Sequence, residues 1–143
     1  MPDIFHTFQI KSSPEQVFEA ISSPDGASVW WALSASGRPE LGSVYELDFG
    51  FGYHWKGRVA ACTAPSHFEW ELIEADDEWL GLKIGFHLEG DESRTKVRFY
   101  NTGWAEENEH FRNSNYCWAM YLRLLKRFVE YRERIPYEER LNV

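Results

Sequence analysis

The sequence has little of what would indicate a disulfide framework, a membrane span or a nucleic-acid site. Its 143 residues include two cysteines, Cys62 and Cys117, at a spacing that suggests neither a metal site nor a redox pair. No apolar run approaches the roughly 20 residues of a membrane span, and no secretory signal opens the chain. The formal net charge of −8 argues against nucleic acid, because phosphate is bound by Lys and Arg. We therefore expect a cytoplasmic protein that neither binds nucleic acid nor inserts into a membrane.

Catalytic and metal-binding motifs are also missing. The sequence contains no phosphate-binding loop, zinc motif or nucleophile motif, and its five histidines are scattered. His6 alone is expected inside, and a lone histidine on an apolar face is more often a hydrogen-bonded core residue than a catalyst. We predict no metal, no cofactor and no catalytic residue, and we favour a protein without enzymatic activity.

Aromatic residues, at 17 % of the chain, and one long periodic segment are what the sequence has in excess. The segment from about Glu107 to Glu133 has the period of an amphipathic helix of roughly 40 Å. Its apolar stripe comprises Phe111, Asn115, Trp118, Tyr121, Leu122, Leu125, Phe128 and Val129. A helix of this length must be packed along one side, so the rest of the chain is expected to cover it.

The remaining segments alternate in the manner of half-buried strands. One strand, Ile4 to Ile10, precedes Ser13-Pro14, which is typical of a helix start. A helix through Val17 to Ile21 and a short helix ending at Trp30-Trp31 follow. Five further alternating segments are expected around residues 45–49, 55–61, 68–72, 80–88 and 97–101. The short links between them favour an antiparallel meander.

These elements predict an α+β fold in which a curved antiparallel sheet of about six strands wraps around the long C-terminal helix. Two short helices follow the first strand. Residues 1–135 are expected to form a single domain, and residues 136–143 a polar tail, because Pro136 stops the helix.

Several local motifs occur in the order found in a known family. They are Ser13-Pro14-Glu15-Gln16-Val17-Phe18, Trp30-Trp31, Leu41-Gly42-Ser43-Val44-Tyr45, Gly57-Arg58-Val59 with Pro65, Phe68-Glu69-Trp70, Thr102-Gly103-Trp104, and Trp118, Leu122 and Leu125. The chain thus resembles homologues of the activator of the ninety-kilodalton heat-shock protein's ATPase, in the START-like or SRPBCC superfamily. It departs at Gly42-Ser43, where the family often has paired glycines, and at Cys117-Trp118, where the family often has Gly-Trp.

The resemblance implies a helix-grip fold with a cavity between sheet and long helix, used in related groups for lipids, sterols or polyketides. The co-chaperone that names the family has a separate N-terminal domain for its main activating contacts. A chaperone interaction is therefore doubtful for this single-domain chain.

Ten residues are predicted to approach that cavity. Tyr45, Asn101, Ser114, Asn115 and His6 would orient a ligand whose apolar body rests on Trp55, Trp70, Phe86, Phe99 and Trp118. The alternative is that the polar groups bond to each other, to backbone or to water, and that each aromatic side chain is core.

We expect a carrier or sensor of a small apolar or aromatic molecule, with a homodimer left open. One alternative is a START-like cyclase or dehydratase in which His6, Tyr45 or Asn101 polarises a carbonyl. Another is a stress-response or co-chaperone-like interaction domain that uses the basic helix face at Arg123 and Arg127, or the edge at Trp79.

Overall fold

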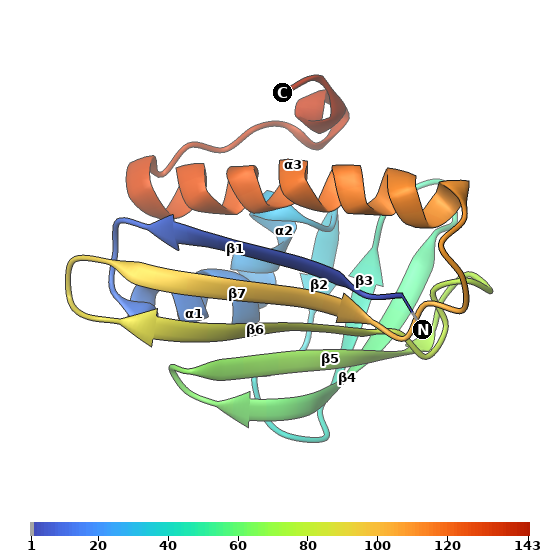
Figure 1. Cartoon of the computed structure of the whole chain (residues 1–143), viewed down its shortest axis with the longest axis horizontal. Coiled ribbons are helices and arrows are strands. Elements are labelled where there is room, and N and C mark those ends of the chain that lie inside the picture. The colour runs from blue at the N-terminus through green and yellow to red at the C-terminus, as the bar shows by residue number, and fades with distance from the viewer. Residues whose placement is uncertain (1) are drawn as a thin grey trace.

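The computed structural model describes residues 2–143, which form a curved seven-stranded antiparallel sheet and three α-helices. In chain order the elements are β1 (Ile4–Ile10), α1 (Pro14–Ser22), α2 (Pro24–Trp30), β2 (Ser34–Ser36), β3 (Val44–Asp48), β4 (His54–Thr63), β5 (His67–Glu74), β6 (Lys83–Gly90), β7 (Thr95–Thr102), α3 (Glu109–Tyr131) and the 3₁₀ helix η1 (Tyr137–Asn142). The strand order is β1-β7-β6-β5-β4-β3-β2. Figure 1 shows α3 running beside β1, while α1 and α2 lie within the curve of the sheet and pack against α3.

This arrangement confirms the predicted helix-grip fold. The long helix begins at Glu109, after Asn108 accepts a hydrogen bond from the Phe111 amide, and it ends before Arg132, which has a positive φ of 57°. The first short helix is capped by Ser13, as expected, and the second by Ser23. None of the helices in residues 2–143 combines the length and apolar character that a membrane crossing requires.

The sheet differs from the expectation at two places. It has a seventh strand, β2, whose three small residues show no alternation that a sequence pattern could detect. In addition, β6 begins at Lys83 rather than near Leu80, because the carbonyl of Asp76 accepts hydrogen bonds from the amides of Trp79 and Leu80 and closes a turn. Trp79 consequently packs inward on Trp55, while Leu80 is 54 % exposed.

The C-terminal segment, residues 133–143, is anchored to the domain. The expected polar tail forms η1, and the guanidinium of Arg140 is buried beneath it. That guanidinium donates to the carbonyls of Ser28, Trp31 and Ala32 at the C-terminal end of α2. A cation is favourable at the negative end of a helix dipole, which explains a buried arginine here.

Candidate functional site

A ring of five aromatic side chains surrounds a hollow between the N-terminal half of α3 and the sheet. Its members are Trp31, Phe49, Trp55, Trp79 and Trp118, which come from the end of α2, the end of β3, β4, the β5–β6 turn and α3. The hollow is partly open to solvent and has a volume of about 210 Å³. We call this hollow the aromatic pocket.

Each member of the ring contacts the next one, so the ring is closed. Going round it, the distances between ring centroids are 5.3 Å for Trp31–Phe49, 4.8 Å for Phe49–Trp55 and 5.1 Å for Trp55–Trp79. They are 6.3 Å for Trp79–Trp118 and 5.5 Å for Trp118–Trp31. Neighbouring planes are tilted by 37° to 66°, which is the offset and edge geometry that aromatic pairs prefer.

One polar group of the ring has no partner. Within residues 2–143, the buried indole N–H of Trp55 donates to no acceptor, although Trp55 is only 8 % exposed. A buried donor without an acceptor costs about 1–3 kcal/mol. This N–H is inaccessible to water and so does not border the pocket space, which makes it a cost of packing rather than an anchor for a ligand.

The helix side of the pocket is more polar. Asn113, Ser114 and Cys117 of α3 line it, together with the Tyr121 ring. Burial raises the pKa of the Cys117 thiol, so this thiol is protonated at neutral pH and is a poor nucleophile. Burial also raises the pKa of Tyr121 to about 12, which keeps the phenol neutral.

A carboxylate–imidazole pair fixes the position of Trp79. The Trp79 indole donates to Nε2 of His110 at 3.2 Å, and Nδ1 of His110 faces the carboxylate of Glu78. This pattern assigns the imidazole proton to Nδ1 and leaves Nε2 occupied by the indole. Hydrogen bonds from His110 and then Asn108 lower the pKa of Glu78 below its ordinary value. The pair therefore positions a wall of the pocket and has no free nitrogen with which to accept a proton from a ligand.

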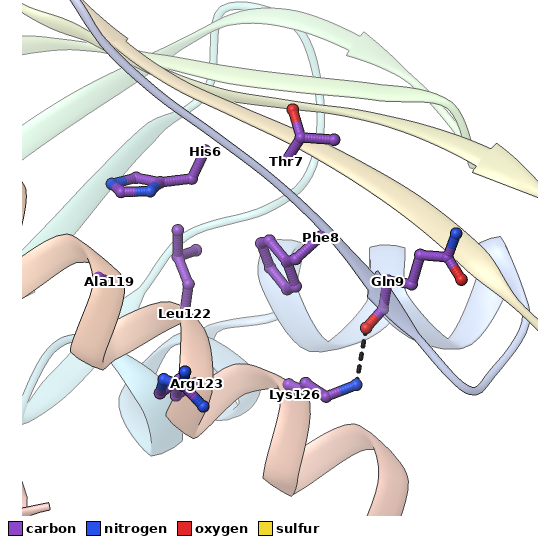
Figure 2. Close-up of a pocket in the computed structure, with 8 residues that line it drawn as sticks. All are labelled: His6, Thr7, Phe8, Gln9, Ala119, Leu122, Arg123 and Lys126. Carbon is purple, nitrogen blue, oxygen red and sulfur yellow. Dashed lines mark hydrogen bonds between the residues drawn. The ribbon is translucent and has the colours of Figure 1, made fainter.

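A second hollow, the edge groove, lies on the other side of α3 against β1 and has a volume of about 470 Å³. Its lining consists of His6, Thr7, Phe8, Gln9, Ala119, Leu122, Arg123 and Lys126. Figure 2 shows Phe8 and Leu122 extending into it, and Lys126 donating to the carbonyl of Gln9 at 2.7 Å. Lys126 also pairs with Glu130, so much of its charge is used to hold α3 to the sheet edge.

The structure divides the ten predicted site residues among three places. Trp55, Ser114 and Trp118 line the aromatic pocket. His6 lines the edge groove and bonds to the exposed Asn115 at 2.9 Å. The other five are packed in the core: Tyr45, Trp70, Phe86, Phe99 and Asn101.

The polar core residues use their hydrogen-bonding groups within the protein. The Tyr45 hydroxyl donates to the Ser22 carbonyl. The side-chain carbonyl of Asn101 accepts from the indoles of Trp104 and Trp118, both at 3.0 Å. The role of these residues in orienting a ligand stays a prediction. It would require Tyr45 and Asn101 to give up these hydrogen bonds within the protein and to form new ones with the ligand.

Several pocket residues were not predicted: Phe49, Trp79, His110, Asn113, Cys117 and Tyr121, together with Trp31 as a wall. A signal existed for those on α3, because His110, Ser114, Cys117 and Tyr121 recur at intervals of three or four residues, with Trp118 beside Cys117. No comparable signal existed for Phe49, which lies in the β3–β4 turn, or for Trp79, which lies in the β5–β6 turn.

Within the described part of the chain, no group of three or more His, Cys, Asp or Glu side chains is placed to hold a metal ion. The basic face of α3 is also partly neutralised. Arg127 donates to the carboxylate of Glu133 at 2.6 and 2.9 Å.

Solved structures share this architecture over most of the chain. The solution structure of the Aha1 dimer from Colwellia psychrerythraea is 31 % identical, covers 92 % of this chain and 98 % of its own, and has a TM-score of 0.82. The protein SSP2350 from Staphylococcus saprophyticus is 20 % identical over 94 % of this chain and 96 % of its own, with a TM-score of 0.79. DynU16, from the dynemicin biosynthetic locus, is 17 % identical over 94 % of this chain and 50 % of its own, with a TM-score of 0.76. At the two lower identities the likeness shows the fold alone.

None of the curated proteins matches the sequence. The profile of one family, described as Activator of Hsp90 ATPase homolog 1-like protein, matches residues 11–130. That match covers most of the chain and confirms the resemblance seen in the motifs, and the Colwellia structure agrees with it. The chain belongs to the Activator of Hsp90 ATPase homolog 1-like family.

Proposed function

We propose that the protein binds a small, mostly apolar or aromatic molecule in the aromatic pocket and acts as its carrier or sensor. One observation carries the proposal: five aromatic side chains in mutual contact line a hollow of about 210 Å³. Apolar walls with few polar anchors are the usual composition of a ligand pocket.

The size of the pocket limits what enters it. An engineered cavity of about 150 Å³ holds one benzene molecule, so a space of about 210 Å³ accommodates a single ring with a substituent. A lipid- or polyketide-like ligand would place one ring or head group inside and leave the rest outside.

The family supports this proposal at a coarse level. Its helix-grip fold fits ligand binding, and one structural neighbour comes from a biosynthetic locus. The Colwellia relative is described as a dimer, and a homodimer of the present chain stays a prediction.

The enzymatic alternative has less support from the geometry. It would use His6, Tyr45 or Asn101 on a substrate carbonyl, but these three do not line one cavity in residues 2–143. His6 lies in the edge groove, whereas Tyr45 and Asn101 are bonded within the core.

A matched pair of variants tests which hollow binds ligand. Cys117→Met extends a side chain into the aromatic pocket from α3, and Ala119→Met does the same in the edge groove two residues later. Native mass spectrometry of the purified protein would detect a co-purified molecule. Calorimetric titration with indole would give the affinity of each variant.

We expect Cys117→Met to weaken indole binding at least about tenfold, because the added atoms occupy the cavity, and Ala119→Met to leave it unchanged. The opposite result would assign binding to the edge groove and overturn the proposal. Binding that neither variant alters would also contradict it.

A further inference from the structure

We propose that the aromatic pocket recognises a quaternary or methylated ammonium group, so that the ligand enters with its cationic end. This inference rests on the proposed function, in which the pocket binds a small molecule, and adds the charge of the part that is enclosed. The supporting observations are the closed aromatic ring, the charges around it and its size.

The ring geometry suits a cation. Indole is the most favourable aromatic partner of a cation, which is attracted when it lies within about 6 Å of the ring centroid. Four of the five ring members are tryptophans, and neighbouring centroids are 4.8 to 6.3 Å apart. An ammonium group in the hollow that these rings line would therefore lie within reach of several of them.

The charges around the pocket favour a cation as well. Its described lining residues include neither Lys nor Arg. The β5–β6 turn that supplies Trp79 carries Asp76, Asp77 and Glu78. Hydrogen bonds from His110 and Asn108 lower the pKa of Glu78, so it remains a carboxylate well into the acidic range. The formal net charge of −8 adds a weak attraction of the same sign.

The pocket volume narrows the choice of ligand further. A trimethylammonium group is similar in size to a benzene ring, which fits a cavity of about 150 Å³, so it fits in about 210 Å³ with its first substituents. Choline, a trimethylammonium group with a two-carbon alcohol substituent, is a simple probe of this size.

The decisive comparison is between choline and 3,3-dimethylbutan-1-ol, which has the same shape but a carbon in place of the charged nitrogen. Both are titrated into the intact protein, and the indole N–H resonances are followed by NMR. Indole is the third probe. We expect choline to bind roughly tenfold more tightly than the neutral alcohol, because only the cation gains from the ring faces and from Glu78.

The outcomes separate this inference from the proposed function. If the alcohol or indole binds and choline binds no more tightly than the alcohol, the pocket stands and the ammonium inference is overturned. If none of the three probes shifts the indole resonances, the proposed function fails with it.

Two variants test the cause of the preference. Trp79→Leu keeps an apolar wall but removes one aromatic face. It should weaken the binding of choline about fivefold and change the affinity for the neutral alcohol less than about twofold. Tyr116→Leu removes an aromatic ring that is 79 % exposed outside the pocket and serves as the control. Equal weakening of both probes by Trp79→Leu would mean that the wall acts only by its apolar area, and would contradict the inference.

Discussion

Replacing Asn101 by alanine should destabilise the protein far more than the loss of one side chain suggests. Asn101 lies on β7 and is fully buried. Its Oδ1 accepts from the indoles of Trp104 and Trp118, and its Nδ2 donates to the carbonyl of Lys83 at 3.1 Å. Asn101→Ala would leave two buried N–H groups and one carbonyl without a partner. At about 1–3 kcal/mol for each of the three unsatisfied groups, the free energy of unfolding should fall by about 3–9 kcal/mol.

Urea denaturation followed by tryptophan fluorescence would measure this loss. Asn115→Ala is the matched control, because Asn115 is exposed and makes one side-chain bond, to His6. It should cost less than about 1 kcal/mol. In a Trp104→Phe background, where one of the two donors is gone, the cost of Asn101→Ala should fall by about 1–2 kcal/mol. A loss for Asn101→Ala no larger than that of Asn115→Ala would refute the reasoning.

Three further changes test other parts of the structure. Arg140→Met removes the donors that hold η1 to the end of α2; it should cost about 2 kcal/mol and abolish hydrogen-exchange protection in the C-terminal segment. The pKa of Glu130 would be raised by burial, but hydrogen bonds and charge, chiefly from Lys126, lower it below its ordinary 4.5. The stabilisation by ionised Glu130 is therefore complete above pH 4.5 and is lost as the pH falls through the lower folded pKa. Glu130→Gln should lower the free energy of unfolding at pH 7. It should also make that free energy depend less on pH in the acidic range, as urea titrations at several pH values would measure. Gly85→Ala would place a methyl group against the Tyr100 ring and should cost about 1–3 kcal/mol in the same titrations.

The long helix was predictable because its signal is redundant. The period recurs through the 23 residues of α3, so errors at single positions do not alter the conclusion. Asn115 was counted on the apolar stripe, yet it is exposed and bonds to His6 at the border of that stripe. The short β2 had no such redundancy, and only its pairing with β3 makes it a strand.

Trp79 shows why the pocket could not be found from alternation. In the sequence, the apolar period of β6 extends back to Leu80, which would turn Trp79 outward. Backbone hydrogen bonds to the Asp76 carbonyl close a turn instead, and the turn reverses the two side chains. A period of two is valid only while the chain stays extended, so a turn inside an apolar run defeats it.

The polar residues show a different limit. Periodicity placed Tyr45, Asn101 and Ser114 inside, and all three are buried. It could not identify their partners, because the Ser22 carbonyl lies 23 residues before Tyr45 and the Trp104 indole belongs to the irregular segment after β7. Sequence patterns give the face of an element, whereas a binding site depends on which groups remain unpaired after folding.

Asn101 also links the core to the pocket, which leads to one more expected result. Trp118 forms a wall of the aromatic pocket, and its N–H is held by Asn101, which does not line the pocket itself. A wall that is fixed before binding spares the ligand the cost of ordering it. At a temperature where Asn101→Ala is still folded, calorimetry should therefore show indole binding weakened by about threefold or more, with a less favourable entropy. An unchanged affinity would show that packing against Trp31 and Phe99 alone positions Trp118.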